Sequence, residues 1–314
     1  MDIKIILGIL FVLLPSISAA NFLDSEIGAR QTGMGGAFVG ISDDASTAYW
    51  NPAGLDELKN VELVYLYGRR YNKGGISFFG LVQPTTSLAG GTWGLFYLQE
   101  DIVEIQDNIP KRKGIEETTI SFGWGKKMNG GFESMPFGLL VGANLKLLKT
   151  GELNNTSRGA AIDIGLLLKP KEILPGTKEI KIGMILRNPL RTKVGSAKLA
   201  SAKLASEKLA SEKPASGFNL GFGVLMDKKI NIGKGIELSN IILSADVNHP
   251  EGESLKVRFG TEMFVNQKLF WRMGTNNGDI AFGAGIIVSQ WQIDYGVSLN
   301  SPKSSHQIAA RLRY

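Results

Sequence analysis

The last sixty or so residues of this 314-residue chain alternate apolar and polar side chains in segments of about ten residues. In 307–314, for example, one face carries Ile308, Ala310, Leu312 and Tyr314. Side chains that alternate with period two mark a strand with two unlike faces, and about ten residues is the length of a strand that crosses a bilayer. The pattern therefore predicts an all-β chain that forms a transmembrane antiparallel β-barrel, with its apolar face toward lipid.

Fourteen segments fit such strands, and the even number returns the chain to the side on which it starts. They are 60–70, 74–83, 90–100, 115–125, 136–148, 157–168, 179–188, 217–226, 238–248, 254–265, 267–274, 279–288, 290–299 and 305–314. The short turns Asn266-Gln267 and Ser289-Gln290 then lie on the periplasmic side, and the long connections 101–114, 149–156 and 189–216 lie outside the cell. Some turns expected in the periplasm are long, so a count that differs by two stays open.

Two soluble architectures compete with a membrane barrel, because a β-sandwich and a lipocalin-like barrel also alternate their side chains. The number and the length of the segments favour the membrane barrel. Its inward positions in the last strands would give a lumen of mixed charge. These positions are Arg258, Glu262, Arg272, Asp294, Arg311 and Arg313.

Residues 1–20 have the pattern of a secretory signal peptide that is cleaved after Ala20. Lys4 precedes the apolar run 5–14, and small residues follow at 18–20. A membrane anchor is the alternative, but the run is well short of the roughly 20 residues of a spanning helix. The chain has no cysteine and so cannot be lipidated as a bacterial lipoprotein. An exported protein of this kind suits the bacterial outer membrane.

The segment 28–55 is too rich in glycine and turn residues for a regular helix or strand. Its marked residues are Gly33, Gly35, Gly36, Asp43, Asp44, Asn51, Pro52 and Ala53. Paired carboxylates can share a proton in acid-base chemistry, but Asp43 and Asp44 precede a short helix-compatible stretch, and capping of that helix is favoured.

Signals of catalysis or of cofactor and nucleic-acid binding are weak. No GxG sequence opens a helix in a βαβ unit, and two histidines make no zinc cluster. The chain has a net charge of +6, but its basic residues are scattered. We therefore expect no enzyme activity, catalytic residue, metal, cofactor or nucleic-acid partner.

The stretch 196–216 repeats SAKLA-like units with a period of five. A helix turns about 100° per residue, so its leucines would not form one stripe. A low-complexity spacer in an extracellular loop is favoured, and a lysine-lined site for anionic lipids or a partner is the alternative.

Residues 33–55, GMGGAFVGISDDASTAYWNPAGL, resemble the N-terminal signature of the PorV/PorQ group within the FadL-like outer-membrane proteins. The segments VRFGTEMF, FWRMGTNNG, FGAGIIV, WQIDYGVSL and HQIAARLRY resemble the closing strands of that group. The resemblance implies a fourteen-stranded barrel, 59–314, whose lumen is plugged by residues 21–58. Asn51, Pro52 and Ala53 would then lie near the start of the wall, and Asp43 or Asp44 could pair with lumenal arginines.

The resemblance implies two functions. FadL-like members pass long-chain fatty acids and other hydrophobic compounds across the outer membrane, whereas PorV-like members receive exported proteins in type IX secretion. The expected partners are outer-membrane lipids, a hydrophobic ligand or a secretion-system protein, and the barrel-assembly machinery. Tyr314 and Leu312 resemble the C-terminal signal that this machinery recognises.

Overall fold

The computed structural model describes residues 27–70, 74–85, 90–106, 109–129, 134–152, 155–192, 195–196, 216–233, 235–300 and 303–314. The expected signal peptide, 1–20, and residues 197–215 of the repeat lie outside this part of the chain.

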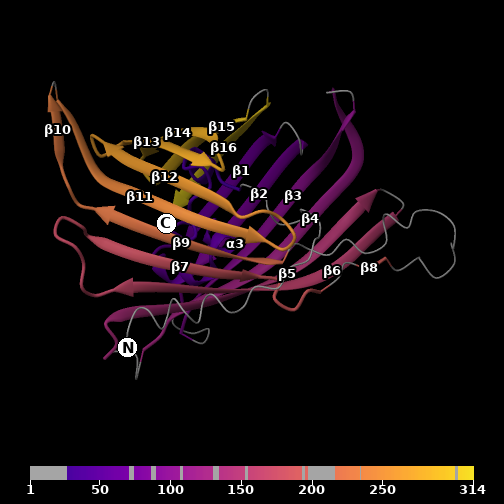
Figure 1. Ribbon diagram of the computed structural model, residues 1–314, viewed down its shortest axis with the longest axis horizontal. Coiled ribbons are helices and arrows are strands. Elements are labelled where there is room, and N and C mark those ends of the chain that lie inside the picture. The colour runs from indigo at the N-terminus through magenta and orange to yellow at the C-terminus, as the bar shows by residue number, and fades with distance from the viewer. Residues whose placement is uncertain are drawn as a thin grey trace.

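Fourteen antiparallel strands close into one barrel, which confirms the predicted fold class and strand number (Figure 1). In order around the barrel they are β1 (Glu62–Arg70), β2 (Gly74–Gln83), β3 (Thr92–Gln106), β4 (Ile109–Lys127), β5 (Phe137–Glu152), β6 (Asn155–Pro170), β7 (Glu179–Arg187), β9 (Gly217–Met226), β11 (Ile236–Pro250), β12 (Lys256–Val265), β13 (Leu269–Asn276), β14 (Asp279–Val288), β15 (Trp291–Asn300) and β16 (Lys303–Arg313). The first and last strands pair from Glu62↔Arg313 to Arg70↔Ser305, so both ends of the wall lie on the same side.

Two connections expected as long loops are instead mostly strand. The segment 101–114 is the upper part of the β3–β4 hairpin, and 149–156 is the upper part of β5–β6. The β5–β6 ladder keeps one register up to the pair Glu152 and Asn155. The β3–β4 ladder shifts its register between Ile102 and Val103 and then continues to the pair Gln106 and Ile109. The sequence did not predict strands here because these segments are polar. A strand needs an apolar face only where that face contacts lipid. Figure 1 shows these two hairpins as the longest arms at the right.

Two short strands were not expected. β8 (Gly195–Ser196) pairs with β6, and β10 (Ile230–Gly233) forms a hairpin with β11. Neither belongs to the closed ring, because β9 pairs directly with β11. The extra strands lengthen connections without changing the barrel.

The two faces of the wall differ as the alternation requires. On β1, Tyr65 and Tyr67 are 54% and 49% exposed, whereas Leu66 between them is 1% exposed. Exposed large apolar residues recur on the outside of the other strands, among them Phe79, Leu95, Leu147, Phe259, Trp271 and Ile308. A continuous apolar outer surface is what a bilayer covers. Among the described residues, no helix is long and apolar enough to cross a membrane.

Residues 27–55 fill the barrel as a plug, and all of them are buried except Asp43, which is partly exposed. The plug contains α2 (Ala29–Gly33) and α3 (Thr47–Trp50), and the 3-10 helix η1 (Pro52–Glu57) leads from it to the wall. Figure 1 shows α3 inside the ring of strands. α2 packs against β13–β16, and η1 packs mainly against β4–β6. The N-terminal segment therefore contacts opposite sides of the barrel.

Glycines on the inner wall let the backbone of the plug touch the strands directly. A Cβ at Gly142 would lie 2.4 Å from the amide nitrogen of Ala53, and one at Gly274 would lie 2.3 Å from the carbonyl carbon of Met34. Side chains at these positions would hold the plug away from the wall. The Asn51-Pro52-Ala53 turn thus lies against β5 and β6 near the base of the plug.

We expect Gly142→Ala to lower the thermal stability of the barrel, because forcing one carbon into packed structure costs about 1–3 kcal/mol. Gly138→Ala is the matched control, since a Cβ on this glycine of the same strand and face meets only Lys169, at 3.8 Å. The measurement is the midpoint of heat-induced unfolding in detergent. Equal midpoints for the two variants would contradict direct packing of the plug on β5.

Candidate functional site

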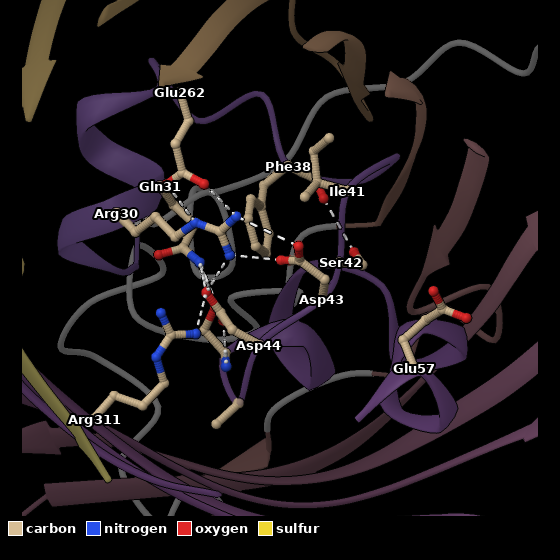
Figure 2. Close-up of polar contacts among 12 residues, drawn as sticks. Arg30, Gln31, Phe38, Ile41, Ser42, Asp43, Asp44, Glu57, Glu262 and Arg311 are labelled. Carbon is tan, nitrogen blue, oxygen red and sulfur yellow. Dashed lines mark hydrogen bonds and ion pairs between the residues drawn. The ribbon is translucent and has the colours of Figure 1, made fainter. Parts of the chain in front are cut away.

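Arg30, on α2, is the central charged group of the plug. Its Nε and Nη2 atoms donate to the two carboxylate oxygens of Glu262 on β12, each at 2.8 Å. Its Nη1 atom donates to Asp43 at 2.5 Å and to Asp44 at 3.0 Å. Figure 2 shows the guanidinium held between the wall and the plug carboxylates. Sequence reasoning missed Arg30, although it is the only lysine or arginine in 21–58.

The contacts of Arg30 belong to a closed ring of alternating charge. From Glu262 the ring passes to Arg272 at 2.5 Å and on to Asp294 at 2.7 Å. Arg311 is 3.9 Å from Asp294 and 3.2 Å from Asp44, and Asp44 returns to Arg30. Three guanidinium groups and three carboxylates thus join the plug to β12, β13, β15 and β16. We call these six residues the charge ring.

Asp44 combines an ion-pairing role with a turn-forming one. One carboxylate oxygen accepts hydrogen bonds from the backbone N–H and the hydroxyl of Ser46, the residue directly before α3. Burial alone would raise the pKa of Asp44, but Arg311, Arg30 and Ser46 hold it well below its ordinary value. Asp43 pairs with Arg30 instead, and its side chain is 32% exposed.

Arg30 stays charged in this site. Burial by itself would lower its pKa, but Asp43, Glu262 and Asp44 raise it well above the ordinary value. Arg30 and Asp44 are therefore both ionised at neutral pH.

Wall side chains also supply partners for the backbone of the plug. Asp246 on β11 accepts hydrogen bonds from the amides of Phe38 and Val39, both at 2.8 Å. Asn51 donates to the carbonyl of Leu166 on β6 at 2.9 Å and accepts from the amide of Ala53 at 3.2 Å. A buried irregular backbone needs such partners.

A second ionic contact fixes the base of the plug. Glu57 at the end of η1 lies 2.8 Å from Lys169 and 2.9 Å from Lys181. Burial would raise the pKa of Glu57, but the two lysines lower it to about 2. Figure 2 shows Glu57 apart from the charge ring.

The remaining residues singled out in the sequence lie in several places. Gly33 approaches Gly283 on β14, Gly35 approaches the backbone of Thr275, and Gly36 approaches Arg258. Gly35 and Gly36 have φ angles of +63° and +75°, which favour glycine. The guanidinium of Arg258 lies 5.9 Å from the centroid of the Trp50 ring.

Arg313 and the C-terminus lie at the rim. Arg313 is 44% exposed and donates to Glu62 at 2.6 Å. Tyr314 is 84% exposed, and its amide bonds to the carbonyl of Val61 at 2.9 Å, while Leu312 lies opposite Leu63 and Trp291. Their role as an assembly signal stays a prediction.

Several charged side chains that face the lumen were not predicted from the sequence. The alternation of inward and outward positions had been used only for the strands in the last third of the chain. The missed residues all have buried side chains and are Glu62, Lys146, Asp163, Lys181, Arg187 and Asp246. Each lies at an inward position of its strand, which the alternation of the neighbouring residues could have revealed.

The plug leaves little free space against β1–β3. One cavity, of about 20 Å³, lies among Arg30, Asp44, Leu66 and Phe78. Another, of about 10 Å³, lies among Tyr49, Phe78, Phe96 and Lys146. Such volumes hold about one water molecule. A solute larger than a water molecule does not fit in either of these two cavities.

Comparison with known proteins defines the fold. No protein-family model matches the sequence, and no curated protein matches it. The structure is similar to that of a FadL homologue from Pseudomonas aeruginosa, with a TM-score of 0.53 and 10% identity over 93% of this chain and 99% of that chain. It is also similar to the CymD monoaromatic hydrocarbon channel, with a TM-score of 0.53 and 12% identity over 94% and 98% of the two chains.

The fold is therefore that of the FadL-type outer-membrane barrels. The finer resemblance to the PorV/PorQ group stays a prediction.

We expect Asp44→Asn to raise the passive conductance of the barrel in planar bilayers. The substitution removes the buried carboxylate that Arg30 and Arg311 share, and breaking a buried ion pair costs about 3–5 kcal/mol. Asp43→Asn is the matched control, because Asp43 is more exposed and pairs only with Arg30 among the charge-ring residues. Conductance that does not change in the Asp44 variant would contradict a role of the ring in holding the plug.

We also expect acid to loosen the plug. Released Glu57 titrates near its ordinary value of 4.5, whereas docked Glu57 titrates at about 2. The ionised carboxylate of Glu57 therefore stabilises the docked plug fully above pH 4.5, and this stabilisation is lost as the pH falls toward about 2. Conductance should rise across that window. Glu57→Gln should give a higher conductance at neutral pH and a flatter response to acid, and a response as steep as that of the wild type would refute the assignment.

Proposed function

We propose that this protein is an outer-membrane channel for hydrophobic compounds such as long-chain fatty acids, with the plug as its gate. The observation that carries the proposal is the apolar inner wall of β1–β3. Six of its inward residues are buried apolar side chains, each less than 9% exposed: Val64, Leu66, Ile76, Phe78, Phe96 and Leu98. The same three strands also carry the buried inward carboxylates Glu62 and Glu100. The lumen of a water-filled porin is polar, so an apolar strip suits an apolar solute. We call these six residues the apolar seam.

The contacts of the plug support a route along the apolar seam. The charge ring joins the plug to β12–β16, and the direct backbone contacts of η1 lie on β4–β6. Both small cavities lie at Phe78, between the plug and the seam. A solute moving there displaces apolar contacts and need not break the ionic ones first.

The similar solved structures point in the same direction. One is described as a FadL homologue and one as a monoaromatic hydrocarbon channel. The signal peptide expected at 1–20 and the apolar outer face of the barrel support insertion in the bacterial outer membrane.

We expect Phe78→Gln to reduce the uptake of oleate into proteoliposomes several-fold, because the substitution places a polar amide in the apolar seam. Ile242→Gln is the matched control, since Ile242 is 7% exposed on β11, away from the seam. If the wild-type protein took up no more oleate than empty liposomes, transport of hydrophobic compounds would be ruled out.

A second experiment separates transport from the secretion role that the resemblance to PorV implies. The protein is purified in mild detergent from its native envelope, and extracted lipids and copurifying proteins are identified by mass spectrometry. Bound fatty acid supports the channel, whereas a stable assembly of secretion proteins would overturn it.

A further inference from the structure

Three polar side chains form a chain of hydrogen bonds on the outer face of the barrel, away from the plug. They are Tyr295 on β15 and Ser304 and His306 on β16, and the two strands are neighbours in the wall (Figure 1). The Oη atom of Tyr295 lies 2.6 Å from Nδ1 of His306, and Oγ of Ser304 lies 3.0 Å from Nε2 of the same ring. The imidazole is thus held between two hydroxyl groups, one on each ring nitrogen.

This arrangement is that of a nucleophile, a base and a group that orients the base. In the tautomer with its proton on Nδ1, His306 donates to Tyr295, and its Nε2 atom accepts a hydrogen bond from the hydroxyl of Ser304. The rings of Tyr295 and His306 also pack together, with centroids 6.1 Å apart. Sequence motifs gave no sign of a catalytic residue here, because Tyr295 meets His306 only through the register of two strands.

The site lies on an apolar part of the outer face. Leu299, opposite Ser304 on β15, is 48% exposed, and Ile308, the next outward residue of β16 after His306, is 52% exposed. The site is at the end of the wall farthest from the pair Glu62↔Arg313, which is the end expected outside the cell. The ester groups of a lipid lie between its hydrocarbon chains and its headgroup. Acyl chains along the apolar face therefore bring ester carbonyls toward the level of Ser304.

Arg69 on β1 supplies a positive charge on the same face. It lies directly opposite His306 in the ladder, and its side chain is exposed. Diagonal neighbours on two strands are within reach of a long side chain, so the guanidinium can approach Ser304, two residues along β16. A cation in this place stabilises the negative charge that develops on an ester oxygen when a hydroxyl attacks the carbonyl.

We propose that Ser304 and His306 hydrolyse carboxylic esters of lipids in the outer leaflet of the membrane. The Oγ atom of Ser304 attacks the ester carbonyl carbon while Nε2 of His306 takes the hydroxyl proton. The bond from that carbon to the alcohol oxygen breaks, and His306 gives the proton to the leaving alkoxide. Water then attacks the acyl-serine with His306 again as the base, which releases the carboxylic acid and restores Ser304. This activity is independent of the proposed channel, because the site lies outside the lumen.

The test measures the release of laurate from dilauroylphosphatidylcholine by the purified full chain in a non-ionic detergent, with mass spectrometry as the readout. Ser304→Ala should lower the rate about 100-fold or more, since both the nucleophile and its contact with the base are lost. Ser305→Ala is the matched control, because Ser305 is the next residue of β16 but lies on the lumenal face opposite Ser298, and it should keep the rate of the wild type. No release by the wild type above that of protein-free micelles, or equal rates for the two variants, would overturn the proposal.

A fluorophosphonate, which reacts covalently with activated serine hydroxyls, keeps the test decisive if Ser304→Ala does not fold. The probe should label the wild-type protein at Ser304, as located by mass spectrometry of its peptides, and should leave Ser305 unlabelled. Absence of a label at Ser304 would refute the assignment of the nucleophile.

Tyr295 is a positioning residue in this scheme, because it contacts the base and not the ester. Tyr295→Phe keeps the ring and removes one hydrogen bond to His306, so kcat should fall about tenfold while KM stays unchanged. A kcat equal to that of the wild type would contradict the role of Tyr295 in orienting the imidazole.

Discussion

The polar groups of an irregular backbone that is buried inside a barrel need hydrogen-bond partners. The contacts between the plug and the inner wall of this barrel supply many of them. A strand in the wall satisfies its amides and carbonyls through its neighbours, but residues 27–55 have no such ladder. Wall side chains provide some of these partners: Asp246 accepts hydrogen bonds from two plug amides, and Arg187 donates to the carbonyl of Tyr49. From the plug, Asn51 donates to the carbonyls of Val39 and Leu166. Glycines such as Gly142 bring the two backbones close enough for these bonds. The plug and the inner wall therefore form one structure.

The wall could be predicted well from the sequence because its strands obey a single rule. All fourteen ring strands overlap the segments chosen by alternation, and the ends of the barrel pair as the even number requires. The rule fails where the chain rises past the bilayer. In 101–106 and 109–112 the ladder persists beyond a shift of register between Ile102 and Val103. Hydrogen bonding, and not hydrophobicity, then decides where the strand ends.

The site was less predictable, because sequence shows which residues face the lumen but not which of them meet. The alternation along each strand predicts that Arg272 and Asp294 both face the lumen. Their 2.7 Å contact, however, depends on the register of β13, β14 and β15, which the alternation does not give. Nothing in the sequence distinguishes Asp43 from Asp44, although only Asp44 is deeply buried and contacts Arg311. The glycines of the wall carried a usable signal. The GxG sequences of β4, β9 and β14 each put two glycines on one face of the strand, and Gly221 and Gly283 meet the backbone of the plug there.

In the proposed channel, the charge ring suits a plug that is released when a solute passes. Burying ions loses their hydration, and the attraction between partners offsets that loss only when the geometry is good. In the closed barrel the contacts of Arg30 meet this condition, with distances of 2.5–3.0 Å from its nitrogen atoms to the carboxylates of Asp43, Asp44 and Glu262. When water enters, the same ions recover their hydration, so opening costs less than the sum of the contacts suggests. A plug held only by apolar contacts would lose them all to water on release. Ionic attachment thus gives the plug one well-defined closed position without making that position permanent.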